Sequence, residues 1–158
     1  MGRRSVSLTP GDMVELRQLV DRYADAVDRR DGAALAALFE ADGAVVMQAG
    51  GGPQPAAWAG PDLPGLLDSL AGYQRTFHHV GGAVFEPDQT GRDDTAVGRT
   101  QCLAHHYQRT ESGPVDLVMA LRYHDRFRRQ PDGAWRIAER RVELEWTELH
   151  PAHPRRRP

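Results

Sequence analysis

Two pairs of adjacent histidines and one aspartate are the residues best suited to acid–base chemistry. The pairs are His78-His79 and His105-His106, and the carboxylate is Asp28. An imidazole has an unperturbed pKa of about 6.5, so it can accept and return protons near neutral pH. The chain contains no lysine, which excludes a Schiff base and a lysine general base. Proton transfer is therefore left to His, Asp, Glu, Tyr and Cys.

The histidine pairs are expected at the start of one strand and within the next, and neighbours on a strand point to opposite faces. At most one histidine of each pair can therefore enter a given pocket. In the second of these strands one face carries Thr100, Cys102, Ala104 and His106, and the other carries Val97, Leu103, His105 and Tyr107. The small residues of the first face leave room for a ligand and favour His106 as the pocket histidine. The residues alone also allow the reverse assignment.

The elements that must position these residues are helices first and strands afterwards. Thr9-Pro10 reads as a helix start, and Asp31-Gly32 ends that helix and begins a second over 33–39. A short strand over 44–47, a Gly/Pro-rich loop over 50–64 and a third helix over 63–74 follow. Period-two patterns then predict strands over 80–85, 96–110, 115–128 and 134–148. This order indicates an α+β domain.

Length, charge and composition favour one globular domain. The chain has 158 residues, of which 40% are hydrophobic, and a net charge of −2, which argues against general nucleic-acid binding. No signal peptide or membrane-spanning run is recognised, and the single Cys102 does not imply an oxidising compartment, so a cytoplasmic protein is expected. We expect a flexible N-terminus over 1–8, a domain over 9–149 and a disordered Pro/Arg tail over 150–158.

Two stretches resemble the SnoaL-like proteins of the NTF2-like superfamily. The first is 23–32 with Leu35 and Phe39, and the second is 122–127 followed by 132–137 and Arg140. The resemblance extends from about residue 8 to residue 146. It implies a cone in which a curved, mostly antiparallel sheet and three N-terminal helices enclose one pocket.

Within that superfamily the pattern is most similar to scytalone dehydratase, which removes water next to a ketone. Asp28 falls at the helix aspartate of that enzyme, and His78 and His106 fall at its two strand histidines. The resemblance implies that the two histidines share proton transfer and that Asp28 orients one of them. Two tyrosines of the dehydratase that hold a water on the substrate carbonyl are Val27 and Met47 here. Tyr23, Tyr73 and Tyr107 are candidates to substitute for them.

Further residues are candidates for substrate contact. The later polar positions of the dehydratase correspond to Arg122 and His124, and Arg122 is also suited to an anionic group. Trp58 in the Gly/Pro-rich loop is a candidate apolar wall, with the loop as a lid, and Cys102 is a small pocket or core residue. The expected substrate-binding set is therefore Tyr23, Met47, Trp58, Cys102, Arg122 and His124. No HxH or HExxH spacing occurs, so neither a metal nor another cofactor is expected.

The function implied is a cofactor-independent dehydratase, isomerase or cyclase acting on a hydrophobic oxygenated small molecule, such as a polyketide or another secondary-metabolite intermediate. One alternative is a non-catalytic ligand-binding or assembly subunit of the same fold. Another is an epoxide hydrolase, which needs a water-activating set of Asp and Arg side chains. Arg99, Arg122 and Asp125 are the nearest candidates for such a set. The resemblance also implies a homodimer or homotrimer, with Tyr107, Phe127 and Trp146 as candidates for its interface or for the core. Neither a nucleic acid nor a membrane is an expected partner.

Overall fold

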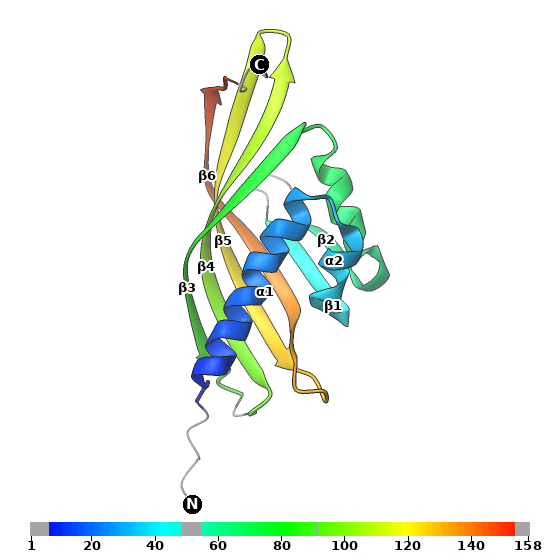
Figure 1. Ribbon diagram of the computed structural model, residues 1–158, viewed down its shortest axis with the longest axis vertical. Coiled ribbons are helices and arrows are strands. Elements are labelled where there is room, and N and C mark those ends of the chain that lie inside the picture. Colours follow the sequence, from blue (N-terminus) through cyan, green and yellow to red (C-terminus); the bar gives the residue numbers. More distant parts are fainter. Residues whose placement is uncertain (1–6, 49–54, 91, 154–158) are drawn as a thin grey trace, which may run out of the picture.

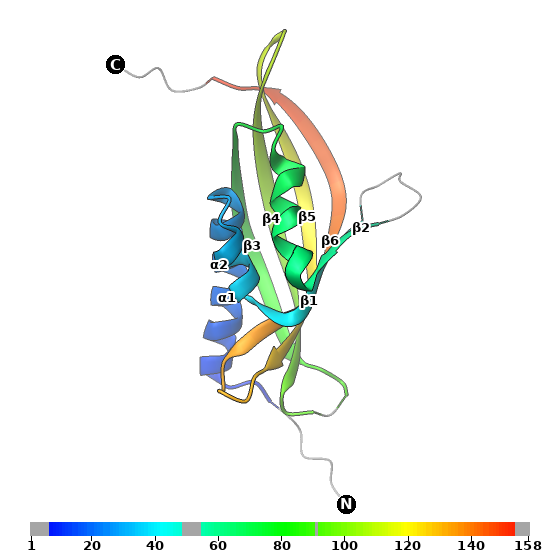
Figure 2. The same ribbon diagram turned by 90° about the vertical axis from the view of Figure 1, so that its right-hand side faces the viewer.

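Six strands form a single curved sheet with the helices on its concave face (Figures 1 and 2). The computed structural model describes residues 7–48, 55–90 and 92–153. Its elements are α1 (Pro10–Asp28), α2 (Gly32–Ala37), β1 (Phe39–Gln48), β2 (Ala56–Ala59), the 3₁₀ helix η1 (Gly60–Leu70), β3 (Arg75–Pro87), β4 (Thr95–Thr110), β5 (Gly113–Arg129) and β6 (Trp135–Pro151). The strand order is β2-β1-β6-β5-β4-β3, with all neighbours antiparallel except the parallel pair β1–β6. The predicted α+β class and curved antiparallel sheet are confirmed.

Helix α1 begins as the sequence predicts. The Thr9 hydroxyl accepts from the Asp12 amide at 3.2 Å, and the Asp12 carboxylate accepts from the Thr9 amide at 2.9 Å. Pro10 occupies the first helical position, where its missing N–H costs nothing. This reciprocal capping box satisfies two backbone donors that the helix itself leaves unpaired.

The other end of α1 is closed by a left-handed residue that is not glycine. Arg30 has φ 57°, and its amide donates to the Val27 carbonyl at 3.1 Å. The Asp31 amide reaches the Ala26 carbonyl at 2.9 Å, which completes a Schellman motif. A left-handed non-glycine residue costs about 1–2 kcal/mol. Asp28 is consequently the last residue of α1, directly before the turn.

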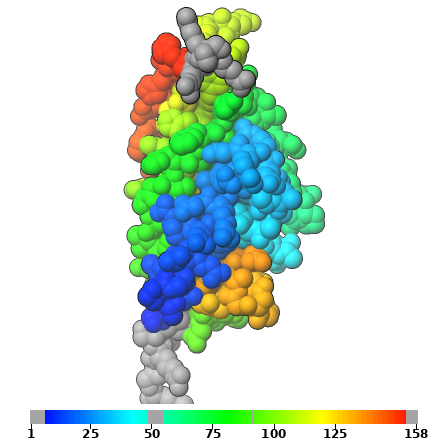
Figure 3. Space-filling view, in the orientation of Figure 1, coloured from blue at the N-terminus to red at the C-terminus, as the bar shows by residue number. Residues whose placement is uncertain are grey.

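The helices and the strands pack through a continuous hydrophobic core. Helix α1 lies against β3 and β6, and η1 lies against β1 and α2. In the space-filling view α1 and α2 cover the strands behind them (Figure 3). Register shifts in the pairing of β3 with β4 and of β5 with β6 interrupt the ladders. Such bulges bend a sheet and increase its twist, which brings the strands around the helices.

A buried ion pair lies within this core. Arg140 on β6 donates to both carboxylate oxygens of Asp125 on β5, at 2.7 and 2.6 Å, and both side chains have no exposed surface. The guanidinium carbon lies 4.1 Å from the ring centre of Tyr23 on α1 and 4.3 Å from that of Tyr123 on β5. The cation therefore joins the helix to two central strands.

Two expectations about the loops and helices need correction. Ala56–Ala59 forms β2 against β1, although the Gly/Pro-rich composition around it predicts a loop. Four residues beside many glycines and prolines give too short a pattern to reveal an edge strand. The third predicted helix is a 3₁₀ helix that ends at Leu70, and it contains Pro64, which cannot donate to a helical hydrogen bond. The predicted Gly50–Gly52 run lies outside the described residues.

Several strands are longer than the sequence pattern predicts. Strand β1 begins at Phe39, five residues before the predicted start, and the helix before it ends at Ala37. Strand β3 begins at Arg75, five residues before the predicted start, so both His78 and His79 belong to it. Strand β6 continues to Pro151, two residues into the predicted tail. Within the described part of the chain, none of the helices is both long enough and apolar enough to span a bilayer.

The three aromatic residues considered for an interface differ in burial. Phe127 is 1% exposed and belongs to the core. Trp146 is 57% exposed and pairs in register with Ala120 on β5. Ala120 pairs on its other side with the exposed Leu103 on β4. Tyr107 on β4 is partly buried. An oligomer contact involving Trp146 or Tyr107 stays a prediction.

Replacing Asp125 by asparagine is expected to lower the free energy of unfolding by about 3–5 kcal/mol, because it leaves the Arg140 charge buried without its partner. Arg141→Gln is the matched control, since Arg141 pairs with Glu139 at 2.7 Å while remaining 59% exposed. That change is expected to leave the free energy of unfolding nearly unchanged, because an exposed ion pair contributes little. Urea unfolding of both variants measures the difference, and equal losses would contradict the central role of the buried pair.

Candidate active site

An apolar cavity of about 140 Å³ lies between α1, η1 and the inner face of the sheet. Strands β1, β3, β4, β5 and β6 and both covering helices contribute to its wall. The lining residues are Tyr23, Val27, Met47, Leu66, Ser69, Leu70, His78, His106, Met119, Leu121, Tyr123, Val142 and Leu144. Two imidazoles in an otherwise largely hydrocarbon wall are the chemically distinctive groups.

Asp28 and His78 form a hydrogen-bonded pair at the edge of this cavity. Asp28 Oδ1 lies 2.7 Å from His78 Nδ1, and Asp28 Oδ2 accepts from the His78 amide at 2.9 Å. The Thr76 hydroxyl donates to Asp28 Oδ1 at 2.8 Å. One carboxylate therefore receives three donors, all of which belong to β3.

These contacts determine the protonation of Asp28. Burial alone raises its pKa, and this is the largest single influence. The hydrogen bonds from the His78 ring, the His78 amide and Thr76 act in the opposite direction and together hold the pKa below the ordinary value for an aspartate. With Asp28 ionised, His78 Nδ1 carries a proton, and His78 Nε2 is the ring nitrogen left for a ligand.

His106 has a different environment from His78. Its Nδ1 lies 3.2 Å from the carbonyl oxygens of both Ala104 and Leu117, which only accept, so Nδ1 is the protonated nitrogen. Burial lowers the pKa of His106, and the neutral ring therefore offers Nε2 as an acceptor. The centres of the His106 and His78 rings are 5.9 Å apart, and the Tyr73 ring lies 4.7 Å from that of His106.

The structure thus brings Asp28, His78 and His106 together, while their catalytic role stays a prediction. Their chain neighbours point elsewhere, as alternation on a strand requires. His79 is exposed, and His105 pairs with Asp116 at 2.6 Å. Among the described residues no group of three His, Cys, Asp or Glu side chains is arranged to hold a metal ion.

Two of the six predicted substrate contacts line the cavity and four do not. Tyr23 and Met47 are part of its wall. Cys102 is 3% exposed within the core, and burial raises the pKa of its thiol, so it is a packing residue. Trp58 lies on β2 against Gly65 of η1, outside the lining set, because it belongs to an edge strand and not to a lid loop.

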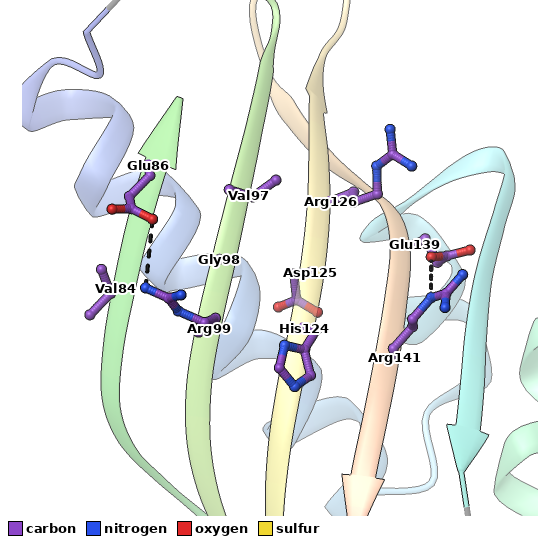
Figure 4. Close-up of a pocket in the computed structure, with 10 residues that line it drawn as sticks. All are labelled: Val84, Glu86, Val97, Gly98, Arg99, His124, Asp125, Arg126, Glu139 and Arg141. Carbon is purple, nitrogen blue, oxygen red and sulfur yellow. Dashed lines mark hydrogen bonds and ion pairs between the residues drawn. The ribbon is translucent and has the colours of Figure 1, made fainter. Parts of the chain in front are cut away.

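Arg122 and His124 also require correction, because the structure places neither at the cavity. Leu121 and Tyr123 on the same strand point inward, so the residues that alternate with them lie on the outer face. There Arg122 pairs with Glu145 at 2.8 Å and His124 with Glu143 at 2.9 Å. Figure 4 shows His124 in a shallow hollow of this outer face, bordered by the Arg99–Glu86 and Arg141–Glu139 ion pairs.

The same geometry separates the residues named for epoxide hydrolysis. Arg99 and Arg122 lie on the outer face, whereas the Asp125 carboxylate is buried on Arg140. No shared water-activating set is formed by these three side chains. The epoxide hydrolase alternative therefore has no support in this arrangement.

Several wall residues were not predicted from the sequence. They are Leu66, Ser69 and Leu70 on η1 and Met119, Leu121, Tyr123, Val142 and Leu144 on the strands. The strand members recur at every second position, which is the signal that could have identified them. On η1 the leucines recur at three- and four-residue steps, which indicates an amphipathic helix but not that this face meets the cavity.

Proton binding to His106 is expected to destabilise the fold in mild acid. Its pKa is about 6.5 in the unfolded chain and lower in the folded protein, so the unfolded state binds more protons in between. The contribution of neutral His106 to the free energy of unfolding is fully present above about pH 6.5 and is lost as the pH falls through the folded-state pKa. His106→Gln should flatten the dependence of unfolding free energy on pH between about 7 and 5. The exposed His79→Gln is the control, and an unchanged slope in His106→Gln would contradict the assignment.

Comparison with known proteins agrees with the architecture. A family model described as the SnoaL-like domain matches residues 11–141. A comparison with curated protein sequences gave no match. Among solved structures, Rv3472 from Mycobacterium tuberculosis, described as a protein of unknown function, is 28% identical, with a TM-score of 0.68 over 87% of this chain and 78% of that one.

Two further structures carry enzyme names in their descriptions. A putative scytalone dehydratase from Novosphingobium aromaticivorans is 24% identical, with a TM-score of 0.68 and coverage of 92% of this chain and 90% of that one. The hexachlorocyclohexane dehydrochlorinase LinA-type3 from Novosphingobium barchaimii is 15% identical, with a TM-score of 0.74 and coverage of 94% and 96%. At these identities the likeness concerns the fold. Because the family model covers most of the sequence, from α1 into β6, the chain belongs to the SnoaL-like domain family of the NTF2-like superfamily.

Proposed function

We propose that this protein is a cofactor-independent acid–base enzyme that removes water, or moves a proton, on a small hydrophobic oxygenated molecule. The observation that carries the proposal is the Asp28–His78 pair, which opens with the neutral His106 onto one apolar cavity. A mostly apolar cavity strengthens the electrostatic effect of such groups once a bound substrate displaces the water that would screen them. Proteins of the same fold, described as a putative scytalone dehydratase and a dehydrochlorinase, are compatible with elimination chemistry.

The two histidines are suited to different parts of the reaction. His78 Nε2 removes a proton from the carbon beside a carbonyl, and Asp28 stabilises the imidazolium that forms. The electron pair of the broken C–H bond forms a carbon–carbon double bond as the bond to the leaving hydroxyl breaks. His78 then returns the proton to that oxygen, which releases water and restores the neutral ring. His106 Nε2 accepts a hydrogen bond from a substrate hydroxyl and holds it in place.

One cavity tyrosine can take part in polarising the carbonyl. Val27 and Met47, which stand where the dehydratase has tyrosines, both line the cavity and donate no side-chain hydrogen bond. Tyr23 also lines it, and burial raises the pKa of Tyr23 to about 12, so its hydroxyl keeps its proton. Tyr123 lines the cavity as well, but its hydroxyl interacts with the Cys102 thiol. Tyr73 and Tyr107 are not among the lining residues. We therefore assign Tyr23 as the candidate donor to the substrate carbonyl.

The volume of the cavity indicates the size of the substrate. An engineered protein cavity of about 150 Å³ holds one benzene molecule, and this cavity measures about 140 Å³. A compound with a single six-membered ring fits this space, whereas a polycyclic polyketide exceeds it. The proposed substrate class is therefore a cyclic hydroxyketone of one ring, or a small secondary-metabolite intermediate of that size.

Binding is expected to depend on ring number. Cyclohexanone-type and phenol-type compounds should shift the NMR signals of His78 and His106, while naphthol-type compounds of the same functional groups should not. The measurement is a titration of histidine-labelled protein with both series. Equal binding of two-ring compounds would show that the cavity does not limit the substrate in this way.

Replacing either residue of the Asp28–His78 dyad, the hydrogen-bonded pair at the cavity edge, is expected to lower turnover strongly without unfolding the protein. In a screen of cyclic hydroxyketones that finds a substrate, Asp28→Asn and His78→Gln should lower kcat by roughly 10²–10⁴-fold, which is the usual contribution of a general base. His79→Gln is the matched control, because His79 is exposed and adjacent in sequence. Full activity of His78→Gln would refute the mechanism.

A non-catalytic ligand carrier is the second candidate, since an apolar cavity of this size can bind without reacting. Its signature would be ligand binding with no product from any bound compound. In that case Asp28→Asn should leave ligand affinity nearly unchanged, because the cavity wall is mostly hydrocarbon. Product analysis of every compound that binds separates the two candidates.

A further inference from the structure

The position of Asp28 is unfavourable for a carboxylate that must stay in one orientation. It is the last residue of α1, where the helix dipole presents its negative end. Its side chain is 22% exposed and borders an open groove, which gives water access to the oxygens. The His78 side chain, in contrast, is only 7% exposed. A partly hydrated carboxylate at this end of a helix needs further contacts to remain aligned with the imidazole.

Thr76 supplies such a contact from two positions before His78 on β3. Its side chain is buried, with the residue 9% exposed, and its hydroxyl lies 2.8 Å from Asp28 Oδ1. Arg30 Nη1 lies 2.7 Å from the same hydroxyl oxygen. A guanidinium only donates, so the threonine oxygen accepts from Arg30 and its single proton is left for Asp28. The direction of the hydrogen bonds is thus determined from Arg30 to Thr76 to Asp28.

The left-handed turn at Arg30 returns its side chain to the end of α1. Arg30 Nη1 also donates to the Val27 carbonyl at 2.7 Å, so one nitrogen binds both the helix end and Thr76. Within the described residues Arg30 forms no ion pair with a carboxylate. Arg30 and Thr76 line the groove beside Asp28, while His78 lines the cavity. Glycine would adopt this backbone conformation without strain, so the backbone does not require an arginine. What arginine adds is the guanidinium that binds the Val27 carbonyl and Thr76.

We propose that Thr76 and Arg30 are positioning residues that hold Asp28 in line with His78. Neither side chain lines the cavity, so they act through Asp28 and not on the substrate. Oδ1 is held by Thr76 and His78, and Oδ2 by the His78 amide, which leaves the carboxylate little freedom to rotate. The effect on turnover rests on the proposed function, whereas the effect on the Asp28–His78 pair does not.

The test compares Thr76→Val with Thr76→Ser in the full chain. Valine keeps the shape of threonine and removes the hydroxyl, while serine keeps the hydroxyl. Solution NMR of histidine-labelled protein follows the proton on His78 Nδ1, which the bond to Asp28 shields from exchange. In Thr76→Val this proton should exchange with water at least tenfold faster, and in Thr76→Ser it should exchange as in the parent protein.

Activity gives the second readout. Thr76→Val should lower kcat by roughly 10–100-fold with KM nearly unchanged, because a small displacement of a catalytic group costs that much. Thr76→Ser should restore most of the rate, which a purely packing role for the threonine methyl would not allow. Equal exchange and equal kcat in Thr76→Val and the parent protein would overturn the proposal.

Arg30→Gly tests the second positioning residue. Glycine adopts φ 57° without strain, so the backbone turn should be retained. The thermal midpoint should not fall, while exchange at His78 Nδ1 should accelerate as in Thr76→Val. Unchanged exchange would remove Arg30 from the proposal. Faster exchange of the His78 Nδ1 proton in Thr76→Val and Arg30→Gly, together with full turnover in Asp28→Asn, would uphold the positioning role and refute the proposed function.

Discussion

The buried Arg140–Asp125 pair, enclosed between Tyr23 and Tyr123, is the interaction on which the rest of the structure depends. Two charges without exposed surface carry a large desolvation cost, which their close bidentate pairing offsets. The bidentate bond joins β6 to β5, and the two aromatic faces supply further favourable electrostatic contact with the cation. These demands allow α1 only a narrow range of positions on the sheet.

That constraint reaches the dyad through the helix. Tyr23 contacts the guanidinium, and Asp28 follows it by five residues, or about 7.5 Å along the helix axis. A helix held at Tyr23 therefore presents Asp28 at a defined height above β3, where Thr76 and His78 meet it. Tyr23 and Tyr123 also form part of the cavity wall, so one cluster supports the fold and shapes the site.

How far the sequence predicts the molecule depends on how local each signal is. Asp28, His78 and His106 could be named because a family pattern and the alternation of a strand identify them, and small neighbours selected His106 over His105. The inward or outward direction of Arg122 and His124 could not be decided, because a one-residue change of phase reverses every side chain of a strand. The Arg140–Asp125 bond requires the register of β5 against β6, which composition does not contain.

The two histidines show why geometry adds what residue type cannot. Both are imidazoles on neighbouring strands, with ring centres 5.9 Å apart, yet one has a carboxylate on Nδ1 and the other has two carbonyls. A carboxylate stabilises a charged ring, whereas burial lowers the pKa of His106 and outweighs the opposite effect of its two carbonyl contacts. The proposed function accordingly assigns proton uptake to His78 and hydrogen-bond acceptance to His106. The two environments differ because β3 is an edge strand that passes the end of α1, where Asp28 can reach it. Strand β4 lies between β3 and β5.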